Sequence, residues 1–460
     1  MVFSSLTFLC VFLPVVFIVY QVLPGLKSKN ALLIIASLFF YAYGEPVYVV
    51  LMIVSTIINW LFGLLVVNNK YQKLFVILSI IANLGFLAIF KYADFFVETI
   101  NNVFESNFEL PNIALPIGIS FYTFQAMSYV IDVYRGVVNK QKNYFYVLLY
   151  ISFFPQLIAG PIVKYKDIEK QLNDRHATID DITSGLIRFC VGLAKKVLIA
   201  NTMGQIVDAI YASNQNEINI CVAWIAALCY IMQIYFDFCA YSDMAIGMAK
   251  IFGFHFKENF NYPYISTSIK EFWRRWHISL STWFRDYLYI PLGGNRKGRP
   301  RTAINKVIVF ACCGLWHGAS WTFLVWGLLH GLALMLEDYI PIKKLPKALG
   351  FIYTLLIVTI LFVIFRADTL SNAGFMLSQM FTGFHFEESC VSLGLSMLTP
   401  LNITTFIFAI VAAFKVGQVL YVKTLKGHVC IQCILALVLL VLCILTLSGG
   451  GYNPFIYFRF

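Results

Sequence analysis

The sequence reads Cys312-Cys313-Gly314-Leu315-Trp316-His317-Gly318-Ala319-Ser320-Trp321 between two apolar runs, which extend over about 303–317 and 319–337. None of these ten residues carries a formal charge, so the stretch suits a membrane interior. The imidazole of His317 has an unperturbed pKa of about 6.5, and burial favours its neutral, basic form. We therefore expect His317 to be a buried general base between two membrane helices. The structural alternative is a buried histidine whose ring is satisfied by a neighbouring carbonyl group.

The composition of the whole chain is typical of a membrane protein. Of its 460 residues, 60% are hydrophobic and 12% are charged, and the mean hydropathy is +0.77. An average soluble domain has roughly 25% charged residues, so this chain cannot cover a water-soluble surface. Its 43 Phe, 26 Tyr and 8 Trp also exclude a disordered chain. The net charge of +11 comes from basic residues in short loops, which indicates orientation in a membrane and not a nucleic-acid-binding surface.

Apolar runs occur along the whole chain. A hydrocarbon layer of about 30 Å needs about 20 apolar helical residues. Runs near this length are found at about 5–24, 31–44, 46–67, 73–91, 113–133, 182–212, 218–236, 303–317, 319–337, 349–366, 397–421 and 429–448. They predict an all-α polytopic membrane protein with about 11–12 transmembrane or re-entrant helices. We expect one membrane domain over 1–460, made of peripheral N-terminal helices, a central core and C-terminal helices at about 1–110, 111–340 and 341–460.

The loops and breaks refine this topology. Basic loops alternate with the acidic segment 94–109 through the first five runs, which places the N-terminus outside. The first run, at about 6–23, lacks a signal-peptide cleavage site and is expected to remain as a span. The run 144–163 has basic residues on both sides and contains Pro155 and Pro161. It predicts a re-entrant element bordering a polar cavity, and a proline-kinked ordinary span is the alternative.

Polar residues within apolar territory are concentrated between 233 and 331. Gln233, Asp237 and Tyr241 follow a four-residue spacing, so one stripe of a helix would hold all three. They are interpreted as residues that line a cavity. The alternative is that Asp237 lies at the interface or pairs with an arginine for structural support.

The segment 271–287 is too charged to cross a membrane and too aromatic for a solvated loop. Its tryptophans and its arginines, among them Arg274 and Arg275, suit the cytoplasmic interface. If the segment is helical, Trp273, His277 and Ser281 share one face at four-residue spacing, and the His277 imidazole points inward.

A second histidine, His330, has a local sequence similar to that of His317. The two are 13 residues apart, which is about 220° around a continuous helix. They would not share a face unless the helix breaks near Gly318. We expect His330 to be a supporting or structural residue.

Two further features are assigned no site. The glycine-rich basic loop 293–301 suits lipid or donor phosphates, but membrane orientation explains it equally well. The eleven cysteines lie mostly in apolar runs, so no disulfide framework is expected. Cys430 and Cys433 form a C-x-x-C with no second pair and no suitably spaced histidine, so no metal site is predicted.

Several long strings of the sequence resemble the membrane-bound O-acyltransferases, and most closely their bacterial alginate O-acetyltransferase branch. A string such as Phe-Trp-Arg-Arg-Trp-His-Ile-Ser-Leu-Ser, at 272–281, is far more specific than any short motif. The resemblance covers nearly the whole chain, including 115–122, 128–135, 153–161, 237–247, 259–264, 271–287, 291–296, 315–319 and 453–455.

The resemblance implies the site residues. His317 matches the family's catalytic histidine, and His277 matches a second position that holds His, Asn or Asp in different branches. Family members hold the catalytic histidine in a central tunnel, open to the donor on one face and to the acceptor on the other. We expect His317 and His277 to be catalytic. Residues expected to bind substrate or line the tunnel are Asp237, Tyr241, Arg274, Arg275, Ser281, Trp316 and Trp321.

The resemblance also implies the reaction and its setting. The expected reaction moves an acetyl group from an acetyl-CoA or acyl carrier protein thioester, across the bacterial cytoplasmic (inner) membrane, for O-acetylation of an alginate-like or related cell-surface polysaccharide. No bound cofactor, no metal and no nucleic acid are expected. The sequence contains no G-x-S-x-G, which suits an extracytoplasmic acetyltransferase partner, or another polysaccharide-modifying partner, that carries the activated serine.

Alternative functions remain open at this point. Within the same family, transfer of D-alanyl groups or transfer to peptidoglycan is possible. Outside it, a transporter or flippase of an activated intermediate is the alternative, because buried Asp, Arg and His with broken helices also describe transport pathways.

Overall fold

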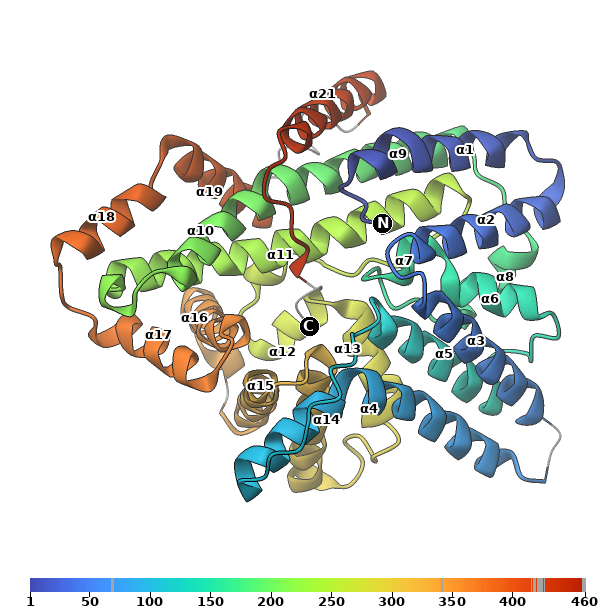
Figure 1. Ribbon diagram of the computed structural model, residues 1–460, viewed down its shortest axis with the longest axis horizontal. Coiled ribbons are helices and arrows are strands. Elements are labelled where there is room, and N and C mark those ends of the chain that lie inside the picture. Colours follow the sequence, from blue (N-terminus) through green and yellow to red (C-terminus); the bar gives the residue numbers. More distant parts are fainter. Residues whose placement is uncertain are drawn as a thin grey trace. The chain divides into compact units, whose positions relative to one another are not determined.

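A computed structural model describes residues 1–67, 70–340, 342–414, 416, 419, 425 and 427–456. This described part of the chain is helical and contains no strand (Figure 1). The chain divides into two compact units, Met1–Phe189 with Tyr241–Glu258 and Cys190–Ala240 with Asn259–Phe460. The predicted all-α membrane fold is confirmed, and the assignment of 1–460 to one domain stays a prediction.

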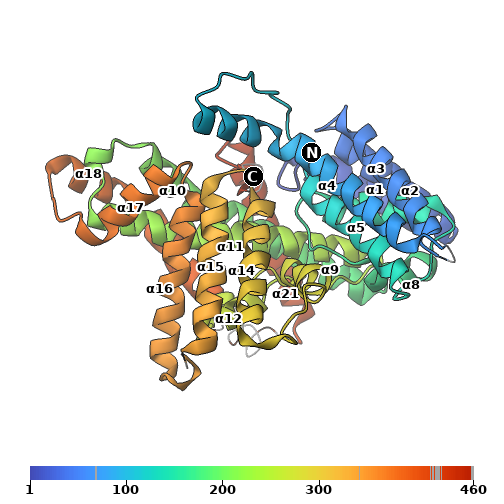
Figure 2. The same cartoon turned by 90° about the horizontal axis from the view of Figure 1, so that it is seen from below.

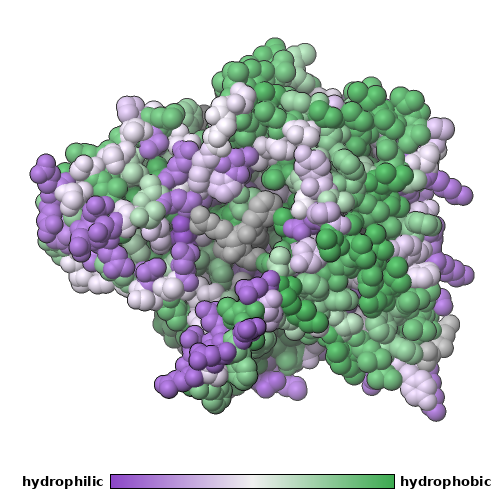
Figure 3. All heavy atoms as spheres, in the orientation of Figure 1, coloured by the Kyte–Doolittle hydropathy of each residue, from purple (hydrophilic) through white to green (hydrophobic). Residues whose placement is uncertain are grey.

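The first unit consists of short and long helices around an apolar interior. A helical segment at Phe8–Phe12 leads into α1 (Leu13–Val22), followed by α2 (Gly25–Ala42), α3 (Tyr48–Leu65), α4 (Gln72–Phe104), α5 (Ile119–Tyr134), α6 (Tyr144–Ser152), α7 (Phe154–Leu157) and α8 (Tyr165–Asn173). The apolar parts of α3 and α4 are only 28% and 17% buried. Figure 3 shows apolar side chains over these two helices. Because so much apolar surface is unfavourable in water, we expect lipid to cover it.

The proline-containing run 144–163 is broken as predicted. Helix α6 ends at Ser152, and Phe153 leaves the helical conformation with φ −52° and ψ 111°. The short helix α7 follows, with Pro155 near its N-terminus, where a missing N–H costs no helical hydrogen bond. The break is confirmed, and the re-entrant path through the membrane stays a prediction.

Two long helices run from one unit into the other. They are α9 (Ile179–Ala194) and α11 (Ile220–Ile251). The second unit also contains α10 (Asn201–Ala212), α12 (Ile269–Arg275), α13 (Ile278–Phe284), α14 (Gly298–His317), α15 (Trp321–Tyr339), α16 (Lys347–Arg366), α17 (Leu370–Thr382), α18 (Glu388–Met397), α19 (Pro400–Ala413) and α21 (Val429–Ser448). Figure 2 shows α14, α15 and α16 side by side.

Several described helices are long and apolar enough to cross a membrane. They are α3, α4, α11, α16 and α21, and the pair α18 and α19, bent by 62°, passes the same test together. The other predicted runs also form helices, but these are shorter or more polar. Part of the run 397–421 lies outside the described residues. The protein is thus a multi-pass membrane protein.

Glycines let α14 and α15 pack backbone to backbone. A Cβ on Gly314 would lie 2.2 Å from the Phe323 carbonyl oxygen, and one on Gly327 would lie 2.2 Å from the Phe310 carbonyl oxygen. A Cβ on Gly318 would lie 2.2 Å from the ring of Phe323. These small residues therefore admit the neighbouring helix. The chain leaves the helix after His317 and re-enters it at Trp321, so His317 lies at the top of a tight helical hairpin.

Candidate active site

His317, the last residue of α14, is enclosed by aromatic rings. The residue is 4% exposed. The ring centroids of Trp316, Trp326 and Phe365 lie 5.1, 5.2 and 5.2 Å from that of His317, all in edge-to-face arrangements. These rings fix the orientation of the imidazole and exclude bulk water from it.

His277 lies in the break between α12 and α13 and is fully buried. Its φ is +42°, a left-handed conformation that is uncommon for a residue with a Cβ. Because α12 ends at Arg275, the expectation that Trp273, His277 and Ser281 share one helix face is wrong. Burial lowers the pKa of His277 well below its usual value, and the charge of nearby His317 lowers it further.

Trp316 joins the two predicted catalytic histidines. Its ring centroid lies 6.0 Å from that of His277 and 5.1 Å from that of His317. The structure thus brings together three residues that were singled out in the sequence, although 40 positions separate the histidines. Their catalytic roles stay a prediction, which the geometry supports.

His330 also belongs to this aromatic cluster. Its ring centroid lies 4.8 Å from that of Trp326, and the Trp326 centroid lies 5.2 Å from that of His317. Trp273 Nε1–H donates a hydrogen bond of 3.2 Å to His330 Nδ1. From the sequence, His317 and His330 could share a face only if the helix broke near Gly318. The helix does break after His317.

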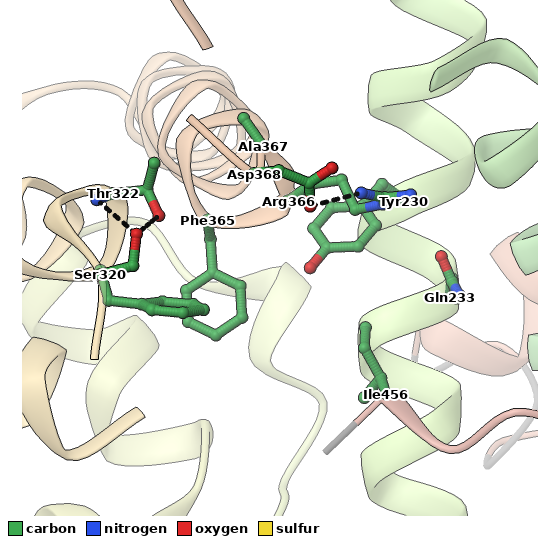
Figure 4. Close-up of a pocket in the computed structure, with 10 residues that line it drawn as sticks. Tyr230, Gln233, Ser320, Thr322, Phe365, Arg366, Ala367, Asp368 and Ile456 are labelled. Atoms are coloured by element: carbon green, nitrogen blue, oxygen red, sulfur yellow. Dashed lines mark hydrogen bonds and ion pairs between the residues drawn. The ribbon is translucent and has the colours of Figure 1, made fainter. Parts of the chain in front are cut away.

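A cavity of about 180 Å³ lies beside the cluster (Figure 4). Phe365 lines this cavity and also contacts the His317 ring, so it links the cavity wall to the imidazole. The cavity is formed by residues from α11, the start of α15, the end of α16 and the C-terminal segment: Tyr230, Gln233, Ser320, Thr322, Phe323, Phe365, Arg366, Ala367, Asp368 and Ile456. Of these, only Gln233 was singled out from the sequence.

Arg366 supplies the positive charge at the cavity. Its guanidinium donates a hydrogen bond of 2.7 Å to Asp208 Oδ1, and it lies 3.8 Å from Asp368. It also stacks on Tyr211, with 4.4 Å between the guanidinium carbon and the ring centroid. An ionisable residue at the end of an otherwise apolar run was the sequence signal that could have identified it.

Asp237 holds the C-terminal segment. Its Oδ1 lies 2.6 Å from Lys196 Nζ, and both side chains are buried. Its Oδ2 accepts a hydrogen bond of 2.7 Å from the backbone N–H of Ile456, and Lys196 donates to the carbonyl of Pro454. This is the structural pairing that the sequence left open, with a lysine in place of an arginine. Because Ile456 lines the cavity, Asp237 acts on it through the backbone of this segment.

The remaining predicted residues have the following surroundings. Tyr241 belongs to the first unit, where it stacks on Phe3 at 4.5 Å. Arg275 pairs with Glu271 at 2.9 Å, and Trp321 is 48% exposed. Arg274 is exposed and Ser281 is half-buried. Their assignment to substrate binding or tunnel lining stays a prediction.

The described residues hold no group of three or more His, Cys, Asp or Glu side chains placed to bind a metal ion. Cys430 and Cys433 lie exposed at the start of α21.

The chain is similar to known proteins over most of its length. The model of the membrane-bound O-acyltransferase family matches residues 135–365, which contain His277, His317 and His330. The chain is 39% identical to a probable alginate O-acetylase of Pseudomonas putida over the full length of both. It is 37% identical to a peptidoglycan O-acetyltransferase of Helicobacter pylori over 81% of this chain and 78% of that one. It is 29% identical to a teichoic acid D-alanyltransferase of Bacillus subtilis, over 48% of this chain and 59% of that one. This multi-pass membrane protein therefore belongs to the membrane-bound O-acyltransferase family and is an acyltransferase.

Proposed function

We propose that the protein moves an acetyl group from a cytoplasmic thioester, across the bacterial cytoplasmic membrane, for O-acetylation of a cell-surface polysaccharide. The full-length similarity to a probable alginate O-acetylase supports this choice of acyl group and makes an alginate-like polymer the first candidate. The observation that carries the proposal is that His277 and His317 both contact the ring of Trp316, and that His317 also contacts Phe365, which lines a cavity.

In this proposal His317 is the general base. Its imidazole takes the proton of the acceptor hydroxyl while the hydroxyl oxygen attacks the thioester carbonyl carbon. A C–O bond forms, the C–S bond breaks, and the departing sulfur takes the proton from the imidazolium, so the products are an ester and a thiol. The surrounding rings contribute by holding the imidazole and excluding water, which limits hydrolysis of the thioester.

The proposed donor is acetyl-CoA or an acetylated acyl carrier protein. The proposed acceptor side is an extracytoplasmic partner that completes the modification of the polymer. The cavity beside Phe365 is the proposed entry for the acceptor hydroxyl, since it combines hydrogen-bonding groups with a wall that contacts His317.

The test replaces His317 with alanine. General-base catalysis contributes typically about 10² to 10⁴ in rate, so His317→Ala should lose nearly all transfer while the protein remains in the membrane. The measurement is ester-linked acetate on surface polymers, by mass spectrometry, in cells whose own copy is deleted and replaced by each variant. His176→Ala is the matched control, because the side chain of His176 is 92% exposed. Normal acetate in the His317→Ala cells, at equal protein abundance, would refute the proposal.

Peptidoglycan is the second candidate polymer, because the similarity to a peptidoglycan O-acetyltransferase also covers most of the chain. The same mass spectra decide between the two polymers, since the one that loses acetate upon deletion is the one modified. Loss of D-alanyl esters instead of acetate would favour the D-alanyl alternative. Substrate movement without thioester cleavage by the purified protein would favour a transporter.

A further inference from the structure

We propose that Asn259 is a positioning residue that holds His277 in a single tautomer. In this tautomer Nδ1 carries the hydrogen, and Nε2 meets the reactants as a hydrogen-bond acceptor. The catalytic part of this inference rests on the proposed function, whereas the tautomer itself does not.

The identity of the Asn259 amide oxygen follows from its neighbours. The backbone N–H of Ser279 points at Asn259 Oδ1 at 3.1 Å, and the Ser279 hydroxyl donates to the same atom at 2.9 Å. A backbone N–H is always a donor, so the atom that faces it is the amide oxygen and not the amide nitrogen. The choice between the two ends of this amide is thereby settled by chemistry.

The protonation of His277 follows from that oxygen. Asn259 Oδ1 lies 3.2 Å from His277 Nδ1. The Ser279 hydroxyl also lies 3.4 Å from Nδ1, but it donates its hydrogen to Asn259 Oδ1 at the shorter distance of 2.9 Å. Because an amide oxygen carries no hydrogen, the hydrogen between Asn259 and His277 belongs to Nδ1. A neutral imidazole with its hydrogen on Nδ1 has a bare Nε2, which accepts hydrogen bonds and does not donate them.

The backbone keeps this arrangement in place. Ile278 N–H donates to the Asn259 carbonyl at 2.9 Å, and Asn261 N–H donates to the Arg275 carbonyl at 2.9 Å. The two chain segments that carry Asn259 and His277 are thus joined by backbone hydrogen bonds. Asn259 itself is 1% exposed. The pairing also holds His277 in its left-handed conformation, the kind of strain that proteins retain at functional positions.

The other ring nitrogen of His277, Nε2, faces the site. His277 Nε2 is buried, and none of the described residues forms a hydrogen bond with it. The nearest rings include Phe238, with centroids 4.5 Å apart, and Trp316, at 6.0 Å. A buried acceptor left without a donor costs free energy, so this nitrogen is complementary to an O–H or N–H group of a bound reactant.

This assignment narrows the role of His277. The carbonyl oxygen of a thioester only accepts hydrogen bonds, so a neutral His277 with a bare Nε2 cannot polarise it. Two reactants supply a suitable donor: the acceptor hydroxyl, and the amide N–H groups of the pantetheine arm of the thioester. Binding of either would orient that reactant beside His317.

The tautomer is tested by ¹⁵N NMR on histidine-labelled protein in lipid. The His277 signals are identified by their loss in the His277→Gln variant. We expect a protonated Nδ1 and a bare Nε2 in the wild type and in Asn259→Asp, which keeps an acceptor oxygen. We expect a mixture of tautomers in Asn259→Leu. A bare Nδ1 with a protonated Nε2 in the wild type would overturn the proposal.

The role in turnover is tested by kinetics with acetyl-CoA. Asn259→Leu should lower kcat by roughly 10- to 100-fold, the range that follows misplacement of a reacting group. Asn173→Leu, the same substitution at an exposed asparagine at the end of α8, is the matched control and should retain kcat. A rise in the KM for acetyl-CoA in His277→Leu identifies the pantetheine arm as the bound hydrogen-bond donor. A fall in kcat alone identifies the acceptor hydroxyl.

Wild-type kcat in Asn259→Leu would overturn the positioning role. Acetylation that survives in His317→Ala refutes the proposed function and leaves the NMR result standing.

Discussion

At the scale of single residues, Phe365 decides how His317 meets the cavity. The Phe365 ring contacts His317, with centroids 5.2 Å apart, and also lines the cavity. Phe365→Leu should therefore connect the cavity to the imidazole and admit water. We expect the ratio of acetyl-CoA hydrolysis to acetyl transfer to rise several-fold, measured as free thiol released without and with an acceptor.

A control on the same helix separates this effect from general loosening. Phe351 is also in α16, but its ring packs against Phe414 with centroids 6.0 Å apart and does not line the cavity. Phe351→Leu should leave the ratio of hydrolysis to transfer unchanged. An equal rise in both variants would show that Phe365 is not the barrier.

At the scale of helices, the hairpin of α14 and α15 depends on glycine. A Cβ on Gly327 would lie 2.2 Å from the Phe310 carbonyl oxygen. Because this oxygen belongs to the backbone of a helix, it cannot move aside as a flexible side chain does. Gly327→Ala should separate the helices, cost about 1–3 kcal/mol of stability and displace Trp326 from His317. The measurement is thermal unfolding in detergent together with acetyl transfer.

The comparison for this prediction is Gly374→Ala. Gly374 is also helical, in α17, but an added Cβ there would have no neighbour within 4 Å. Alanine favours helix by about 1 kcal/mol over glycine, so this variant should be as stable as the wild type or more so. If Gly327→Ala is equally well tolerated, the hairpin is less tightly packed than the contacts indicate.

The helices and the proline-marked break at Phe153 were predictable from the sequence, but the break at His277 was not. Long apolar runs predicted α3, α16 and α21 because only a helix satisfies its backbone within a lipid layer. The break at His277 has no proline or glycine in it. It depends on the pairing of that segment with Asn259, which lies 18 positions earlier. The buried position of His277 agrees with the expected inward orientation, but the continuous helix that would have placed it on one face with Trp273 and Ser281 is absent.

At the scale of the whole molecule, the end of the described chain is held by its middle. Lys196 and Asp237 form a buried ion pair, which anchors residues 454–456 against the cavity. Asp237→Leu leaves a buried ammonium without its partner and should cost about 3–5 kcal/mol. Adding Lys196→Met removes that charge and should restore most of the stability. Thermal unfolding of the four proteins of this cycle measures the coupling.

The ion-pair prediction fails if the double variant is no more stable than Asp237→Leu alone.

The ion pair also shows what a single sequence does not reveal. Asp237 was recognised as an unusual charge in an apolar run, but its partners lie 41 and 219 positions away. A single sequence shows that a charge lies in an apolar run and is costly to bury, but it does not show which residue offsets that cost. The cavity, built from four separate segments, was unpredictable for the same reason.

The aromatic enclosure of His317 has a consequence for the energetics of the cell. Many cell membranes hold an electrical potential, and each elementary charge that crosses them dissipates about 2.3 kcal/mol per 100 mV. An imidazole wetted from both compartments would relay protons continuously. Packed between Trp316, Trp326 and Phe365, the ring of His317 is insulated while no reactant is bound. In the proposed function, where His317 is the general base, this packing limits the leakage of protons through its imidazole.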